Sequence, residues 1–150
     1  MHRPGCLAYG GLKRFDEYGR VTGERRILGL YTHNVYTANV TEIPVVRRKV
    51  AAVRERAGFL PASHNGKAFG SILEDYPRDE LMQIEPGQLY EFAIAILQLG
   101  ARQRTRLLVR RDAYGRFVTC MVYVPRDKYS TEQRQRFQRI GHQNRFQVRD

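Results

Sequence analysis

The alternation of apolar and polar positions predicts two β-hairpins, one near each end of the chain. Residues 6–15 and 26–31 form the first pair of strand-like runs, and residues 104–111 and 116–124 form the second. The second pair is rich in β-branched and aromatic residues, which favour extended backbone. Pro125 follows directly and ends the last of these strands, because proline cannot donate a ladder hydrogen bond.

The two hairpins share one turn sequence, Asp-x-Tyr-Gly. It occupies residues 16–19 and again residues 112–115, 96 positions later. Asp early in a turn and Gly late in it are typical of hairpin connections. A duplicated unit would explain the repeat, but a turn sequence used twice explains it equally well, and we favour the second interpretation.

Between the hairpins, apolar residues recur at helical spacing. Thr37 or Thr41 is expected to open the first helix, with Glu42 in its first turn, and Gly58 to end it. Its predicted buried positions are Ile43, Val46, Val50, Val53 and Ala57.

Two more helices are expected after Gly58. Ser63 can cap a helix that ends near Tyr76–Pro77, and residues 78–85 are predicted to be connecting structure. A third helix begins at Pro86 and ends at Gly100. Its predicted buried stripe is Leu89, Phe92, Ala93, Ile96 and Leu97.

The last helix follows the second hairpin. Ser130 and Gln133 have the spacing of a capping box, and Gly141 is expected to end the helix, leaving a loose tail. The order is then hairpin, three helices, hairpin, helix. This order predicts an α+β fold in which two antiparallel β-hairpins are separated by a helical connector.

The charge of the chain bears on which kind of partner it could bind. The net charge is +11, and only four of the 26 basic residues are lysines. A basic balance suits nucleic acid, and nine tyrosines interleaved with arginines could stack bases. The charge is nevertheless spread along the chain, and arginine also pairs with carboxylates at domain interfaces. Packing is the preferred use of these residues, and nucleic-acid binding stays as the alternative.

Cysteine usage and hydropathy suggest a cytoplasmic protein. No apolar run approaches the roughly 20 residues needed to span a bilayer. Cys6 and Cys120 lie in apolar, strand-like surroundings and are predicted to be free thiols. The four histidines are scattered and make no zinc pattern with them.

The candidate catalytic groups all have simpler structural explanations. Ser63–His64 could suggest a nucleophile and a base, but a helix cap explains Ser63. Asp75, Asp79 and Glu80 could do acid–base chemistry, but such a cluster more often caps helices and pairs with arginines. Phosphate-binding glycine loops are absent from the sequence. We therefore assign no catalytic, cofactor-binding or metal-binding residue to this chain.

Four ordered segments resemble one family, the large bacterial NAD-specific glutamate dehydrogenases. They are residues 24–32, 42–50, 63–81 and 106–127, and together the resemblance covers about residues 10–140. It implies a non-catalytic, amino-terminal regulatory region built from ACT-like and PAS-like modules. The family's dehydrogenase domain, with its catalytic lysine and dinucleotide fold, has no counterpart in this sequence.

The resemblance also implies a domain division and partners. Residues 1–40 would end a PAS- or ACT-like sheet, 41–85 would be the helical connector, 86–140 a partial ACT-like module, and 141–150 a loose tail. NAD would be bound by the parent enzyme and not by this chain. The expected partners are the rest of the parent chain, sister subunits and an amino-acid effector, with neither nucleic acid nor membrane.

Overall fold

The computed structural model describes residues 8–100, 104–115, 117–143 and 147–148, and divides the chain into two compact units, 1–39 and 40–150. The first unit holds β1 (Ala8–Phe15), β2 (Val21–Gly29) and α1 (His33–Thr37). The second holds α2 (Val46–Ala57), α3 (His64–Asp75), α4 (Arg78–Gln83), α5 (Pro86–Gly100), β3 (Arg106–Arg111), β4 (Val118–Tyr123), a short 3-10 turn (Arg126–Lys128), α6 (Thr131–Gln143) and β5 (Gln147–Val148). The α+β class and both antiparallel hairpins are confirmed.

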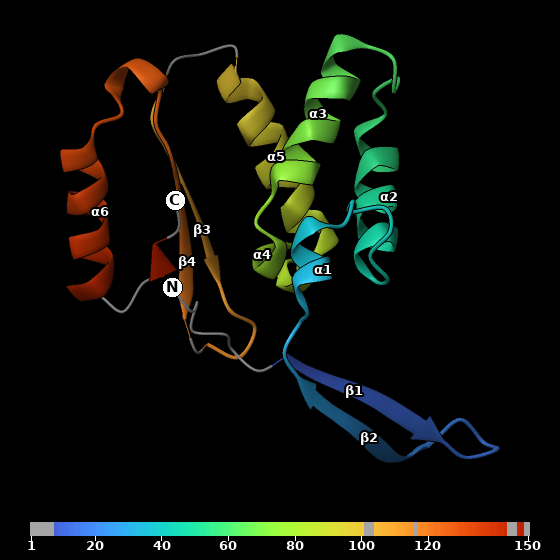
Figure 1. Cartoon of the computed structure of the whole chain (residues 1–150). Helices are drawn as coiled ribbons and strands as arrows, with labels where there is room; N and C mark the ends of the chain where they lie inside the picture. The colour runs from blue at the N-terminus through green and yellow to red at the C-terminus, as the bar shows by residue number, and fades with distance from the viewer. Residues whose placement is uncertain (1–7, 101–103, 116, 144–146, 149–150) are drawn as a thin grey trace. The chain divides into compact units, whose positions relative to one another are not determined.

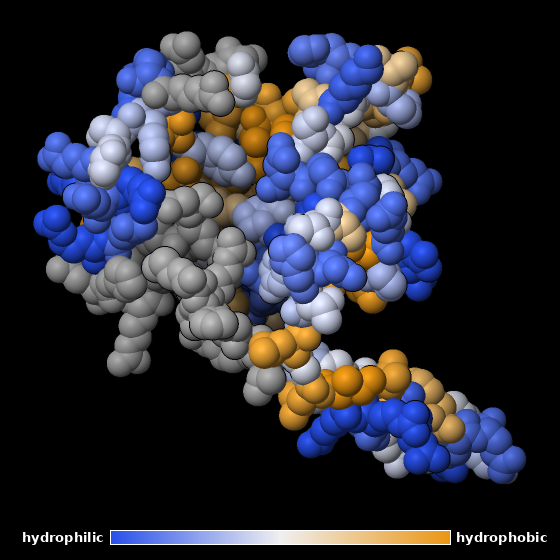
Figure 2. Space-filling model, in the orientation of Figure 1, coloured by the Kyte–Doolittle hydropathy of each residue, from blue (hydrophilic) through white to orange (hydrophobic). Residues whose placement is uncertain are grey.

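The first unit is an antiparallel hairpin followed by a short helix (Figure 1). The predicted turn at 16–19 is present: the amide of Gly19 donates to the carbonyl of Asp16, and Gly19 has a φ of +75°. The side chain of Asp16 also accepts from the amides of Tyr18 and Arg20. Almost every side chain of the hairpin is exposed, and apolar residues are visible along it in Figure 2.

The second unit contains the apolar core of the described chain. Its three-stranded sheet lies between α6 on one side and the layer of α3 and α5 on the other, and α2 packs against α5 (Figure 1). In the sheet, β4 lies in the middle, antiparallel to β3 and parallel to β5. The buried apolar side chains are Val40, Ile43, Val46, Val50, Val53, Phe69, Leu73, Tyr76, Leu81, Ile84, Leu89, Ala93, Ala95, Leu108 and Met121.

Helix ends follow their predicted chemistry in three places. Ser63 caps α3, its hydroxyl oxygen accepting from the amide of Gly66 at 3.0 Å. Gly58 ends α2 with a left-handed φ of +65°. The Ser130 hydroxyl accepts from the amide of Gln133 at 3.2 Å, as its part of a capping box requires.

Other boundaries differ from prediction. α2 begins at Val46 rather than just after Thr37 or Thr41, because Val45 forms a tight turn in which the amide of Val46 donates to the carbonyl of Pro44. The short helix α1 was not predicted. α6 continues through Gly141 to Gln143, and the segment expected to be a loose tail includes β5 among its described residues.

The predicted connector at 78–85 is the clearest error, since residues 78–83 form α4. Pro77 precedes this helix, and Asp79 and Glu80 lie in its first turn, where a negative charge is favourable. Six residues are too few for a periodic signal. Only packing of Leu81 and Glu80 into the interior reveals the helix.

Candidate functional site

The most distinctive polar feature of the described chain is a buried cluster between α4 and the sheet. The Glu80 carboxylate from α4 accepts from Arg110 Nε at 2.5 Å and from the Thr119 hydroxyl at 2.7 Å. The side chains of Glu80 and Arg110 are only 3% and 4% exposed. Both carboxylate oxygens of Glu80 therefore have a partner in the interior.

Strand geometry explains why Arg110 and Thr119 meet the same carboxylate. They are directly opposite in the β3–β4 register, so both side chains leave the same face of the sheet. Along β3, Leu108 and Arg110 are buried, whereas Leu107, Val109 and Arg111 point to the other face. Arg110 is thus a charged residue at an inward-facing position of a strand whose side chains alternate between the two faces of the sheet.

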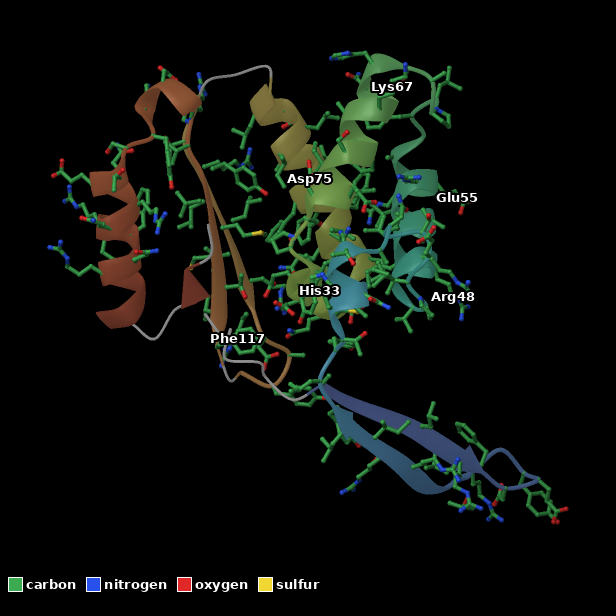
Figure 3. The ribbon with its side chains drawn as sticks, viewed as in Figure 1. His33, Arg48, Glu55, Lys67, Asp75 and Phe117 are labelled. Atoms are coloured by element: carbon green, nitrogen blue, oxygen red, sulfur yellow. The ribbon has the colours of Figure 1, made fainter. Side chains whose placement is uncertain are left out.

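Electrostatics favour the charged pair. The hydrogen bond that Arg110 donates to the Glu80 carboxylate raises the pKa of Arg110, against the opposing effect of burial. Asp112, also buried, adds a second nearby carboxylate that raises the pKa of Arg110. The Arg110 guanidinium also lies 6.0 Å from the ring of Phe117, at the turn end of the hairpin (Figure 3). Removing one member of such a pair typically costs about 3–5 kcal/mol, because the other charge is left buried and unpaired.

Tyr76 borders the cluster at the end of α3. Burial, and then the negative charge of Glu80, raise the pKa of Tyr76 well above its ordinary value. Its hydroxyl is buried without a hydrogen-bond partner among the described residues, as is Nη2 of Arg110. The interior beside Glu80 therefore favours a neutral phenol.

The other end of α4 is held from α2. Lys49 Nζ donates to the carbonyls of Leu81 and Met82, at 2.8 and 3.3 Å. These are carbonyls of the last turn of α4, where a cation is favourable. Burial lowers the pKa of Lys49; the negative charge of Glu85 opposes this effect, and the positive charge of Arg110 adds to it. One short helix is thus tied to α2 through Lys49 and to the sheet through Glu80.

The predicted acidic cluster separates in the structure. Glu80 turns inward to Arg110 and Thr119, whereas Asp75 is exposed at the end of α3. Asp79 stays half-buried in the first turn of α4. Pairing with arginine is confirmed for Glu80, but the partner comes from a strand 30 residues away. The nearby Arg78 instead binds the carboxylate and carbonyl of Glu74, both at 2.6 Å.

The remaining predicted candidates also have structural places. Ser63 is the cap of α3 and His64 is exposed. Cys120 is a half-buried free thiol on β4, and burial raises its pKa; Cys6 lies outside the described residues. Across the described residues, no group of three His, Cys, Asp or Glu side chains could hold a metal ion.

Two arginines lie over tyrosine rings among the described residues. The Arg56 guanidinium lies 4.2 Å from the ring centre of Tyr90, joining α2 to α5, and Arg20 lies 5.2 Å from Tyr18 in the first hairpin. Tyr76 is in the core. Packing therefore accounts for Tyr76 and for the Arg56–Tyr90 contact, whereas Tyr18 is exposed.

A groove of about 930 Å³ opens between the α3–α5 layer and the end of β4. Its lining includes the apolar residues Ile72, Ile96 and Leu97 and the charged residues Arg104 and Asp127. Apolar residues are visible between the helices and the sheet in Figure 2. Sequence spacing predicted the apolar stripe of α5, but the half-burial of Ile96 and Leu97 shows that this stripe lines the groove as well as the core.

Two family models match the chain, and their boundary falls just before the second hairpin. Residues 43–102 match the helical motif 1 of glutamate dehydrogenase, and residues 106–149 match its ACT2 domain. The NAD-specific glutamate dehydrogenase of Halomonas elongata is 47% identical over 140 residues, which cover 93% of this chain. The chain belongs to the glutamate dehydrogenase family.

Other relatives agree with this assignment. The NAD-specific glutamate dehydrogenase of Pseudomonas aeruginosa is 43% identical over 93% of the chain, and that of Mycobacterium tuberculosis is 35% identical over 78%. The chain spans only 9% of the length of the first two relatives and 7% of the third. No solved structure matches the chain. No helix among the described residues is long and apolar enough to cross a membrane.

The family boundary places the buried cluster across two modules. Glu80 belongs to helical motif 1, and Arg110 and Thr119 belong to the ACT2 domain. The two modules nevertheless form one compact unit. The cluster joins the glutamate dehydrogenase helical motif to its ACT2 domain through side chains that neither module could satisfy alone.

Proposed function

We propose that this chain is a non-catalytic regulatory and oligomerisation segment of an NAD-dependent glutamate dehydrogenase. The observation that carries the proposal is the match of residues 106–149 to the ACT2 domain, together with helical motif 1 before it. The parent enzyme would oxidise L-glutamate to 2-oxoglutarate and ammonia in the cytoplasm. NAD would bind elsewhere in the parent, and this chain's partners would be the rest of that chain and sister subunits.

Within this segment we propose the domain division implied by the resemblance. Residues 1–40 would end a PAS- or ACT-like sheet, 41–85 would be the helical connector, 86–140 a partial ACT-like module and 141–150 a tail. The family models instead keep residues 86–102 with helical motif 1 and extend the ACT2 domain to residue 149. Exposed apolar side chains on the first hairpin, among them Tyr9, Leu28 and Leu30, support the first part of this division. A hairpin of two strands is only marginally stable by itself, so a larger sheet would bury these residues.

Turnover by the isolated chain is the direct test. The 150-residue chain is incubated with L-glutamate and NAD, and NADH formation is followed by absorbance. The expected result is no NADH above the background without protein. Sustained NADH formation that scales with the amount of chain would overturn the non-catalytic role.

An amino-acid effector would act through this segment. A thermal-shift screen of the chain against the common amino acids tests this, because a ligand that binds only the folded state raises its midpoint temperature. At a concentration 100-fold above its dissociation constant, such a ligand contributes about 2.7 kcal/mol. A flat response across all amino acids at millimolar concentration would remove the effector from the proposal.

The alternative function, a basic nucleic-acid-binding module, is favoured by the net charge of +11. Phosphate binding of this kind weakens steeply as salt rises. Fluorescence anisotropy with labelled single-stranded RNA and duplex DNA at 50 and 200 mM salt distinguishes the two functions. Binding at low salt that collapses at high salt would support the alternative, and no binding at low salt would eliminate it.

A further inference from the structure

The buried cluster attaches α4 to two neighbouring strands of the sheet at once. Glu80 uses one carboxylate oxygen for Arg110 on β3 and the other for Thr119 on β4. An apolar contact between a helix and a sheet tolerates sliding, because the hydrophobic effect is not directional. Two hydrogen bonds that neighbouring strands donate to one carboxylate restrict how α4 can lie on the sheet.

The same helix transmits that placement to α2. Lys49 reaches from α2 to two carbonyls of the last turn of α4, while Glu80 holds its first turn to the sheet. α4 has only six residues, so the two attachments lie within one short rigid element. A shift of the β3–β4 hairpin would therefore move α4, and with it the contact to α2.

We propose that Glu80, Arg110 and Thr119 form a latch that sets a single orientation of the ACT2 domain on helical motif 1, and that α4 passes movements of the ACT2 sheet to α2. The latch costs stability compared with an apolar contact of the same shape, because two charges lose their hydration. Its role is to select one arrangement, as buried polar groups do in some other proteins. This inference goes beyond the proposed function and does not depend on it.

Replacing Glu80 and Arg110 together by apolar residues tests whether the pair sets the orientation or only contributes stability. Glu80→Leu and Arg110→Met alone each leave one buried charge unpaired, and each should lower the midpoint temperature by about 10 °C or more. The combined variant removes both charges of the Glu80–Arg110 pair and should recover to within about 5 °C of the parent chain.

The orientation of the ACT2 domain on helical motif 1 is measured as the distance between two spin labels, one in each module. Glu55→Cys on α2 and Arg106→Cys on β3 provide exposed label sites in a background with Cys6→Ser and Cys120→Ser; Glu55 points away from the helical layer in Figure 3. With the latch intact, double electron–electron resonance should give one narrow distance. In the Glu80→Leu/Arg110→Met background it should give a broadened or double distribution despite the recovered stability.

Glu74→Gln is the matched control. It removes a partly exposed ion pair, to Arg78, that lies wholly within helical motif 1, and it should leave the distance narrow. Thr119→Val keeps both charges and nearly the same shape, and by itself it should broaden the distance distribution. If the double apolar variant does not recover its stability, this variant tests whether the cluster sets the orientation. A single narrow distance unchanged in these latch variants would overturn the proposal while leaving the proposed function standing.

Discussion

A strained residue, Val45, directly precedes helix α2. Val45 has a φ of 71° and a ψ of −54°, and the amide of Val46 donates to the carbonyl of Pro44 two residues back at 2.9 Å. This is the geometry of a γ-turn that is rare for any residue and unfavourable for a β-branched one. Val45 is also 69% exposed, so its side chain contributes little burial in return.

Replacing Val45 with glycine should therefore stabilise the fold. Relief of backbone strain outweighs the added freedom of the unfolded chain, and we expect a gain of about 1 kcal/mol. Thermal or urea unfolding of Val45→Gly measures it. Ala52→Gly, at an exposed position within the same helix, is the control and should lose about 0.5–1 kcal/mol. If Val45→Gly lowered the free energy of unfolding as much as the control does, the backbone at Val45 would not be strained.

Two glycines of α3 differ in the space around them. A Cβ at Gly66 would clash with the backbone carbonyl oxygen of Leu60, whereas a Cβ at Gly70 would lie 3.5 Å from the guanidinium of Arg54. The close approach at Gly66 arises because the Ser63 hydroxyl binds both the Leu60 carbonyl and the Gly66 amide.

Alanine at these two positions should have opposite effects on unfolding. Gly66→Ala must push the chain before the helix outward and should destabilise the fold by about 1–3 kcal/mol. Gly70→Ala meets only ordinary contact and should stabilise by about 0.5–1 kcal/mol, the usual gain for alanine within a helix. Denaturant unfolding measures the free energy of unfolding of both variants. Equal effects would show that the backbone at Leu60 moves aside without a cost in stability.

At the scale of elements, the end of α3 creates a pH response. The folded pKa of Tyr76 is raised above its ordinary value of 10.0, mainly by burial. Its contribution to stability is complete below pH 10 and is lost as pH rises toward the folded pKa, because the unfolded chain releases the phenol proton first. Alkaline solution should therefore weaken the packing between α3 and the sheet.

Tyr76→Phe should make this alkaline loss of stability shallower. The midpoint of urea unfolding is compared at pH 8 and above pH 10, and at pH 8 the variant should be at least as stable as the parent, since the buried hydroxyl has no partner among the described residues. Part of the alkaline loss should persist, because burial also raises the pKa of Tyr123. Tyr129→Phe, at an exposed site, should leave the pH dependence unchanged. The same steep loss in Tyr76→Phe would show that Tyr76 does not cause it.

For the whole molecule, the division into two units predicts independent stability. Every buried apolar residue of the described chain lies at or after Val40, and residues 1–39 form a compact unit of their own. Removing residues 1–39 should change the midpoint temperature of residues 40–150 by less than about 2 °C. Calorimetry of both chains measures this, and a loss of about 5 °C or more would show that the hairpin supports the core.

Local chemistry made much of this fold predictable. The Asp-x-Tyr-Gly turns, the Ser63 cap and the Gly58 end were all read correctly, because each depends on residues within a few positions of one another. The start of α2 and the whole of α4 were missed. At Val45 the structure holds a conformation that local propensity disfavours, and α4 is too short to show a period.

Sequence by itself determined the order of the two hairpins and the four longer helices, the excess of positive charge and the resemblance to glutamate dehydrogenases. Only the tertiary structure decided which of the acidic residues near Tyr76 is buried and which arginine it meets. Glu80 lies 30 residues from Arg110 and 39 from Thr119. No periodicity reports a contact over such a separation, because it depends on where α4 comes to rest against the paired strands and not on the residues next to Glu80 in the chain.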